Sequence, residues 1–230
     1  MKRFVIAVLF ALISVSSLVA GSEVNDRVVR AAIVLREITE TLDKTIPQDL
    51  LDKSSCVAVI TGMKKGGFIF GANYGKGLLS CRTGNGDGPW SAPSMFMLQG
   101  GSFGLQIGGQ SVDLILVIMN LSGLESMLNT KFTLGGDASV AAGPVGRTAS
   151  AETDALMSAQ ILAYSRTRGL FAGLVIKGGV IRPDKDANHV LYGKAIEPRE
   201  ILFQQTQTVP KDAKIFLDEL ARVSPKKLNK

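Results

Sequence analysis

Apolar residues near the start of the chain recur at alternating intervals of four and three residues. They are Val24, Val28, Ala31, Leu35, Ile38 and Leu42. The charged residues of this segment are placed elsewhere on the helical wheel, at Arg27, Arg30, Glu37 and Glu40. This spacing predicts an amphipathic helix of about five turns. Its polar face mixes both charge signs, which favours packing on the domain core over lying on a membrane. Pro47 then predicts a second, short helix that ends near Leu51.

From residue 56 onward the apolar runs become short and are separated by glycine. Six runs predict strands, at residues 56–61, 68–74, 77–82, 95–99, 103–107 and 112–119. Glycine-rich turns are expected between them, at residues 64–67, 84–88 and 108–109. Because no helices alternate with these strands, the sheet is predicted to be antiparallel.

The second half of the chain continues this pattern. Leu121, Leu124 and Leu128 suggest a short helix, and five further strands are expected at residues 132–134, 137–142, 161–166, 170–177 and 180–182. One short helix follows Pro183 and ends near Gly193, and a last helix runs from Pro210 to just before Pro225. Glycines inside strands indicate bulges and bends. The predicted fold class is α+β, with a curved, barrel-like antiparallel sheet flanked by N-terminal and C-terminal helices.

The first 21 residues have the pattern of a secretory signal peptide. Lys2 and Arg3 precede an apolar run over residues 4–13, and small residues lead to Ala20 and Gly21 as cleavage points. That run is shorter than the ~20 residues needed to span a bilayer. We therefore expect an exported protein, periplasmic or extracellular, with a leader (1–21), one domain (22–225) and a basic tail (226–230).

Composition adds a mild positive charge and two cysteines. The formal charge is +6, and removal of Lys2 and Arg3 with the leader leaves +4. In an exported protein this excess favours an anionic lipid surface over nucleic acid, although dispersed, solvated cations account equally well for the charge. Cys56 and Cys81 both lie in predicted strands, where a disulfide and two small buried side chains fit the pattern equally well.

The segment Gly100-Gly101-Ser102-Phe103-Gly104 matches the G-x-S-x-G nucleophile elbow of α/β-hydrolases. With the single histidine, His189, it raises the alternative of a serine hydrolase that uses Ser102 and His189. A nucleophile elbow joins a strand to a helix, whereas residues 103–108 alternate as a strand does. We interpret residues 100–104 as a hairpin turn and predict no enzymatic activity.

Phosphate-loop and metal chemistry are poorly supported. Residues 71–77 contain Gly-Lys, but the glycine spacing differs from a phosphate loop and no Ser or Thr follows Lys76, so a turn between strands is expected. One histidine and two separated cysteines do not form a zinc set. No cofactor or metal is predicted.

The tetrapeptide Trp90-Ser91-Ala92-Pro93 resembles the signature of the SYLF lipid-binding domain. Other segments resemble this family in the expected order: Ile46-Pro47, 57–60, 71–77, 100–108, 143–147, 163–173 and Tyr192. The resemblance extends over roughly residues 27 to 205, and the shared order of these motifs makes it specific.

The resemblance implies binding of membrane lipids, including phosphoinositides in eukaryotic members, and actin bundling in fungal relatives. The predicted leader resembles the bacterial branch, so we expect a peripherally associated protein that binds anionic phospholipid head groups. A structural envelope protein whose partner is another protein is the remaining alternative. Six basic residues are the candidate lipid contacts: Lys64, Lys65, Lys76, Arg147, Arg166 and Arg168.

Overall fold

The fold is taken from a computed structural model. The structure describes residues 20–38, 45–66, 72–103, 112–120, 128, 131–146, 158–167, 170–174, 176–204 and 207–225. Its strands are β1 (Cys56–Gly66), β2 (Ala72–Cys81), β3 (Ser94–Phe103), β4 (Val112–Ile118), β5 (Phe132–Thr133), β6 (Val140–Ala142), β7 (Ile161–Thr167), β8 (Leu170–Gly173) and β9 (Ile176–Pro183). Residues 20–38 form a helix, called here the N-terminal helix. The other helices are α2 (Gln48–Lys53), α5 (Lys185–Tyr192), α6 (Pro198–Leu202) and α7 (Lys214–Val223), with 3₁₀ turns η1 (Gly84–Gly86) and η2 (Lys211–Ala213).

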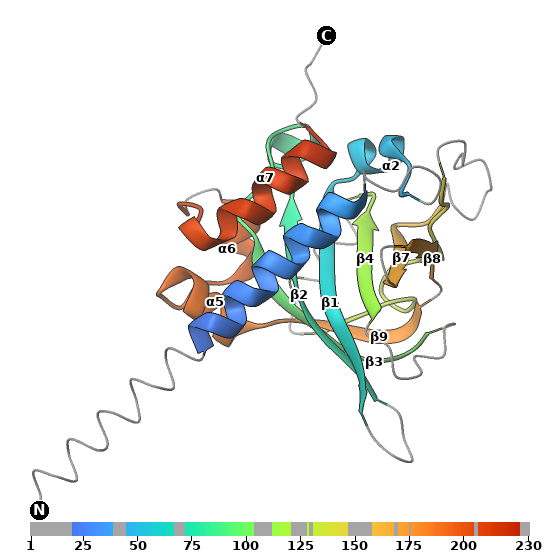
Figure 1. The fold of residues 1–230 in the computed structure, drawn as a ribbon, viewed down its shortest axis with the longest axis horizontal. Helices are drawn as coiled ribbons and strands as arrows, with labels where there is room; N and C mark the ends of the chain where they lie inside the picture. The colour runs from blue at the N-terminus through green and yellow to red at the C-terminus, as the bar shows by residue number, and fades with distance from the viewer. Residues whose placement is uncertain are drawn as a thin grey trace, which may run out of the picture.

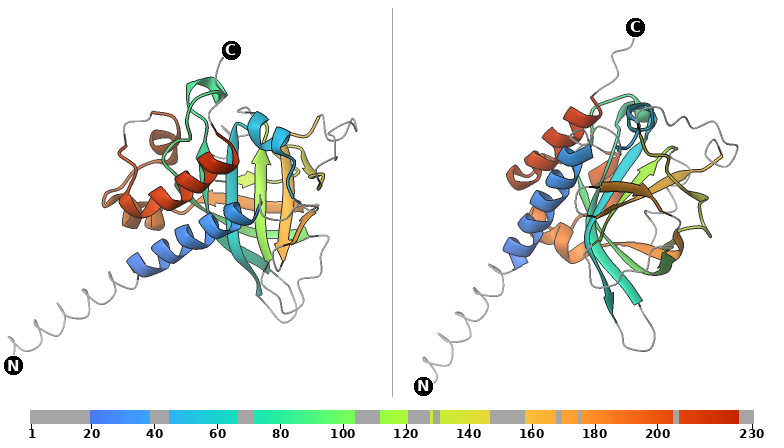
Figure 2. Two further views of the ribbon diagram at one scale, coloured as in Figure 1. Left: turned by 45° about the horizontal axis from the view of Figure 1, so that its top comes forward. Right: turned by 45° about the vertical axis from the view of Figure 1, so that its right-hand side comes forward.

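All the described strands belong to one curled sheet. Their order is β5-β9-β3-β2-β1-β4-β7-β6, with β8 also paired to β7, and only the β6–β7 pair is parallel. Figures 1 and 2 show the sheet curving away from the N-terminal helix and α7, which cover one of its faces. The predicted α+β class, with a curved antiparallel sheet between N-terminal and C-terminal helices, is confirmed. Within the described residues, no helix has the length and apolar character needed to cross a membrane.

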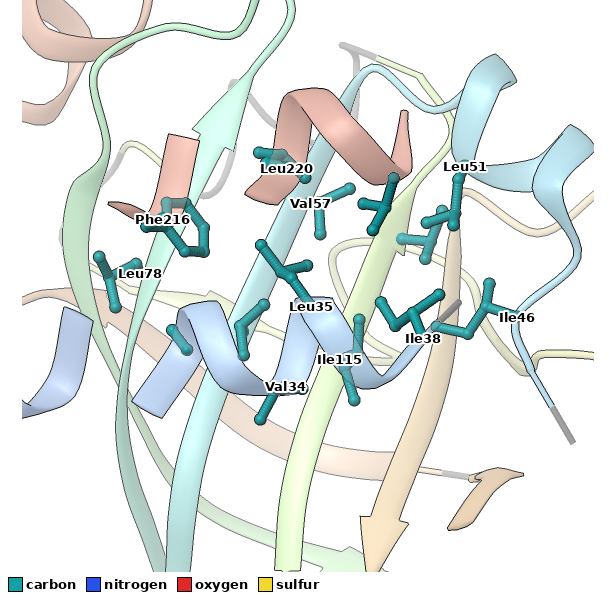
Figure 3. Close-up of a cluster of buried hydrophobic side chains, with 14 of the residues drawn as sticks. Val34, Leu35, Ile38, Ile46, Leu51, Val57, Leu78, Ile115, Phe216 and Leu220 are labelled. Atoms are coloured by element: carbon teal, nitrogen blue, oxygen red, sulfur yellow. The ribbon is translucent and has the colours of Figure 1, made fainter. Parts of the chain in front are cut away.

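The apolar stripe of the N-terminal helix packs on the sheet, as the periodicity predicted. Val28, Leu35 and Ile38 are almost completely buried. In Figure 3, Leu35 and Ile38 lie beside Val57 and Ile115 of the sheet, and Phe216 and Leu220 of α7 and Leu51 of α2 join the same cluster. The helix is therefore held mainly by burial of apolar surface, which contributes about 25 cal/mol per Å².

The central strands bury both of their faces. On β1, Val57 and Val59 contact the helices, whereas Ala58 and Ile60 point into the inside of the curl. Cys56 and Cys81 also lie on the inner face, directly opposite each other in the β1–β2 pair, and a disulfide joins them. Because both faces are covered, these strands are continuously apolar in sequence. We call the two sides the helix-covered face and the inner face.

Two predicted turns, at residues 64–67 and 71–77, are wrong over their described residues, because the chain is strand as far as Gly66 and again from Ala72. Lys64 and Lys65 pair with Tyr74 and Asn73 inside the β1–β2 ladder, and Lys76 pairs with Thr61 in the middle of β2. The glycine-rich sequence around Lys64 reflects a bulge between Thr61 and Lys64, where Gly62 adopts a φ of 61°.

The glycine before Leu78 likewise marks a close contact and no turn. A Cβ atom on Gly77 would lie 2.2 Å from the carbonyl oxygen of Val59 on the neighbouring strand. Only glycine allows β1 and β2 to approach this closely. Glycine richness in β2 is therefore a consequence of packing within the sheet.

Three other predictions also differ from the structure. β3 runs unbroken to Phe103, with Ser102 paired to Lys177 of β9, so the hairpin turn expected at residues 100–104 is wrong as far as Phe103. The strand expected at residues 170–177 is divided between β8 and β9. Of residues 137–142 only β6 is strand, because 135–137 form a turn. α6 was not predicted. Residues 104–111 and 121–127, which carry the expected turn at 108–109 and most of the leucine-rich helix, lie outside the described residues.

Candidate functional site

The signature tetrapeptide is buried and anchors neighbouring elements. The Trp90 Nε1–H donates to the carbonyl of Ser224 at 2.9 Å, and the Ser91 Oγ accepts from the backbone N–H of Cys81 at 3.1 Å. The Tyr192 hydroxyl donates to the carbonyl of Pro93 at 2.7 Å. This motif therefore holds the ends of α7 and α5 against the sheet and presents no ligand-binding group to solvent.

Arg82 completes this buried anchor. Its guanidinium stacks on Trp90, 4.3 Å from the ring centroid, and Nη2 donates to the carbonyl and the hydroxyl of Ser224 at 2.9 and 2.6 Å. A further bond reaches the Pro225 carbonyl at 3.0 Å. Burial lowers the pKa of Arg82. We call Arg82, Trp90, Tyr192 and Ser224 the signature anchor.

The N-terminal helix begins beside α5 (Figure 1). A pocket lies there, between the first turns of this helix, β2, β3 and α5. Its volume is about 320 Å³. Because its walls combine charged and apolar side chains, the pocket suits a ligand that has a polar head and an apolar body. The lining residues of this helix-end pocket are Ala20, Glu23, Val24, Arg27, Tyr74, Lys76, Met97, Asp184, Asp186, Ala187 and Val190.

A chain of ion pairs crosses the pocket. Arg27, only 3% exposed, donates from Nη1 to Asp184 at 2.9 Å, and its Nη2 lies 3.5 Å from Glu23. Lys76 Nζ lies 3.0 Å from the same Glu23 carboxylate. The hydrogen bond from Lys76 is the main cause that lowers the pKa of Glu23, and the bond to Glu23 raises the pKa of Lys76. Asp184 is fixed a second time because its Oδ1 accepts from the Ala187 N–H at the start of α5.

A basic surface continues from the pocket along the helix-covered face. The register places Lys64 opposite Tyr74, and Lys76 between Thr61 and Met97. Arg182 lies on the far side of Met97, on β9. Since paired residues point to the same face, these side chains share one surface beyond the end of the helix. We define the basic sheet face as Lys64, Lys76 and Arg182 with Tyr74, Met97 and Val180.

The structure brings two of the six predicted lipid contacts together. Lys64 is exposed and Lys76 is one-third exposed, both on the basic sheet face. Of Lys65 the structure describes only the backbone, and Arg147 and Arg168 lie outside the described residues.

Arg166 lies apart from this surface, on β7, where it has a structural contact. Its guanidinium forms ion pairs with Glu37 of the N-terminal helix and Asp113 of β4. Burial opposes the charged form, but the hydrogen bonds that Arg166 donates to Glu37 and Asp113 raise its pKa. These contacts tie the end of the helix to the sheet.

Sequence reasoning missed Arg27, Asp184 and Arg182. The assignment of Arg27 to the polar side of the helix is wrong, because it lies three residues after Val24 and four before Ala31, within the apolar stripe. This spacing was the available signal. Nothing local in the sequence indicates that Asp184, 157 residues away, is its partner.

The described residues do not support the serine hydrolase alternative. The backbone at Ser102 belongs to β3, which stays extended to Phe103, the last residue described before residue 112. Asp184 is engaged by Arg27 and by the Ala187 N–H, and His189 is exposed on α5. The described residues also contain no cluster of three or more His, Cys, Asp or Glu side chains that could hold a metal ion.

Comparison with known proteins identifies relatives over most of the chain. The family described as "Ysc84: Las17-binding protein actin regulator" matches residues 99–223. The chain is 36% identical over 165 residues to an SH3 domain-containing protein of Schizosaccharomyces pombe, PJ696.02, which covers 70% of this chain. It is 34% identical over 171 residues to LAS seventeen-binding protein 3 of Saccharomyces cerevisiae, covering 73% of the chain.

A human relative extends this match. SH3 domain-containing YSC84-like protein 1 of Homo sapiens is 33% identical over 191 residues, or 80% of this chain. The chain spans only 38%, 37% and 55% of these three relatives. The family description names binding and regulation, LAS seventeen-binding protein 3 is named for binding, and none of these names indicates an enzymatic activity. The SYLF resemblance is thereby confirmed, and the chain belongs to the Ysc84/SYLF family.

Proposed function

We propose that this protein binds anionic phospholipid head groups at a membrane surface through the basic sheet face, without turning over a substrate. Long-range attraction brings the cationic face to the bilayer, and limited burial of apolar side chains follows. The proposal names a lipid as the ligand, whereas one relative, LAS seventeen-binding protein 3, is named for binding another protein.

The observation that carries the proposal is the combination of cations with apolar side chains on the part of the helix-covered face that extends beyond the end of the N-terminal helix. Lys64 and Arg182 are exposed, and Tyr74, which lies between Lys64 and Gln99 in the ladder, is 38% exposed. Val190 of α5 adds an exposed apolar side chain at the rim of the helix-end pocket. A membrane interface offers phosphates to the cations and hydrocarbon to the apolar groups.

The size of the expected attraction is modest. Each cation near an anionic bilayer contributes about 1 kcal/mol at low salt. Lys64, Lys76 and Arg182 together would provide about 3 kcal/mol, reduced by Glu23 and Asp186 at the edge of the face. Binding should therefore be reversible and should weaken as salt screens the charges.

Sedimentation with vesicles tests the proposal. The full chain is expressed, and the purified protein is mixed with phosphatidylcholine vesicles with or without phosphatidylglycerol, at about 50 mM and about 500 mM salt. The test variant is Lys64→Gln/Lys76→Gln/Arg182→Gln. The control, Lys131→Gln/Lys211→Gln/Lys214→Gln, removes the same charge from exposed positions elsewhere.

We expect binding that requires phosphatidylglycerol, falls at high salt, is lost in the test variant and survives in the control. Equal loss in both triple variants would reject the basic sheet face as the site. No binding by the unmodified protein would reject the lipid function and favour a protein partner, which the "Las17-binding" description of the family supports as the second candidate.

Export is a separate part of the proposal, supported by the pattern of residues 1–21. Mass spectrometry of the protein recovered from a bacterial host that expresses the full chain should give a mature form that begins near Ser22. Recovery of the uncleaved chain in the cytosolic fraction would contradict it.

A further inference from the structure

The Glu23 carboxylate lies between the two cations of the helix-end pocket. Its Oε1 atom is 3.0 Å from Lys76 Nζ and 3.5 Å from Arg27 Nη2. One oxygen thus receives an ammonium and a guanidinium group at once. An oxygen of a phosphate ester forms charge-assisted bonds with the same donors.

The two sides of this arrangement differ in how firmly they are held. Arg27 is 3% exposed and anchored by Asp184, whereas the Glu23 side chain is 57% exposed near the start of the helix. Exposed ion pairs contribute little to stability. The cations are therefore a prepared site, and the carboxylate that occupies it can leave by a change of rotamer.

We propose that Arg27 and Lys76 form a phosphate-ester subsite that Glu23 occupies in the unliganded protein and that the phosphate of a phospholipid head group takes over. This inference rests on the proposed lipid function and adds to it the atom-level contact. Glu23 then acts as a built-in competitor that weakens binding of anions.

The charges that face the pocket favour a phosphate that replaces the Glu23 carboxylate over one that binds beside it. Glu23, Asp184 and Asp186 supply three carboxylates against the two cations Arg27 and Lys76. A phosphate added beside Glu23 would meet a net negative pocket. Replacing Glu23 by a phosphodiester leaves the pocket charge unchanged, while Tyr74, Met97 and Val190 remain beside the glycerol and acyl portions of the lipid.

The variant Glu23→Gln tests the inference, because it removes the competing charge and retains the size of the side chain. The matched control is Glu197→Gln, an exposed carboxylate, 58% accessible, that pairs with Lys185 at 2.7 Å outside the pocket. Vesicles of phosphatidylglycerol and phosphatidylcholine are titrated with each full-length protein. We expect Glu23→Gln to bind roughly three- to fivefold more tightly than the unmodified protein, with Glu197→Gln nearly unchanged.

Soluble glycerol phosphate, titrated by calorimetry, separates a lipid head group from a free phosphate ester. Weak binding of glycerol phosphate beside strong vesicle binding supports the lipid as ligand. Comparable affinity for both would keep the subsite but make the soluble ester its ligand.

Two failures are distinguishable. If the unmodified protein binds vesicles through the basic sheet face but Glu23→Gln binds no better than Glu197→Gln, the exchange is overturned and the lipid function stands. If neither the unmodified protein nor Glu23→Gln binds vesicles or glycerol phosphate, both proposals fall. Thermal unfolding of each variant shows that the fold is retained.

Discussion

Two buried arginines, Arg27 and Arg82, are used in opposite ways. Their side chains are almost completely buried, with relative exposures of 3% for Arg27 and 2% for Arg82. Arg82 bonds to neutral oxygens of the chain and is covered by the Trp90 ring. Arg27 pairs with the carboxylates of Asp184 and Glu23 and lines an open pocket.

The difference separates an anchor from a binding site. In the signature anchor, the guanidinium of Arg82 donates to backbone carbonyls just after α7. These bonds hold it in the fold, and it does not face a ligand. In the helix-end pocket one of the two partners of Arg27 is exposed and replaceable. The tetrapeptide most typical of the family thus supports the fold, and less conspicuous residues provide the candidate site.

Substitution of Arg27 should have the largest effect. Arg27→Met leaves the buried Asp184 carboxylate without its cation and is expected to lower the free energy of unfolding by about 3–5 kcal/mol. Urea denaturation followed by circular dichroism measures this change. The double variant Arg27→Met/Asp184→Asn should recover part of the loss, because the uncompensated charge is gone.

This recovery tests whether the unpaired charge of Asp184 causes the loss of stability in Arg27→Met. A double variant no more stable than Arg27→Met would show that shape and packing around the guanidinium, and not the charge of Asp184, determine the cost.

Substitution of Arg82 should cost less, in spite of its equal burial. Arg82→Met removes the donors to the Ser224 and Pro225 carbonyls, which are neutral, and Trp90 still donates to Ser224. We expect a loss of about 2 kcal/mol in the same urea experiment. Vesicle binding should be unchanged after correction for the folded fraction. A loss larger than that of Arg27→Met would reverse the proposed order.

Much of the fold was predictable because burial imposes periodicity on the sequence. The N-terminal helix and the central strands follow from apolar spacing, and α5 follows from Pro183 before it and Gly193 at its end. Errors arose at glycines, because glycine occurs both in turns and where two neighbouring strands pack closely. Gly77 is required by the close approach of β1, so its presence beside Lys76 suggested a turn where the chain is extended.

The candidate site was only partly predictable. Lys64 and Lys76 were selected as basic residues in glycine-rich segments that were expected to be turns. The pairing of Arg27 with Asp184 depends on how the helix crosses the sheet toward α5, and no local pattern encodes that approach. Arg166 was selected for its charge, but its two carboxylate partners come from residues 37 and 113.

Substitution of Tyr192 in the signature anchor should change the free energy of unfolding less, and the change should depend on pH. Burial raises the pKa of Tyr192, so its contribution to stability is complete below the ordinary tyrosine value of about 10 and is lost as pH rises above it. Tyr192→Phe removes the bond to Pro93 and should cost about 1 kcal/mol at neutral pH. Between about pH 10 and 11, the stability of Tyr192→Phe should fall less steeply with pH than that of the unmodified protein. Parallel pH profiles would contradict this assignment.

The smallest expected effect belongs to Glu23, and it tests the pocket side of the comparison most directly. Because the hydrogen bond from Lys76 lowers the pKa of Glu23, the pair stabilises the fold above the ordinary glutamate value and loses this contribution as pH falls through the lowered pKa. The exposure of Glu23 keeps the contribution below about 0.5 kcal/mol, too small for a denaturation curve. Carbon-13 NMR of the carboxyl groups can instead measure the pKa of Glu23 directly. In Lys76→Gln we expect the Glu23 pKa to rise toward its ordinary value, and in Lys185→Gln we expect no change. An unchanged Glu23 pKa in Lys76→Gln would show that the two side chains are not paired in solution, and Glu23 would then not compete with a phosphate for Lys76.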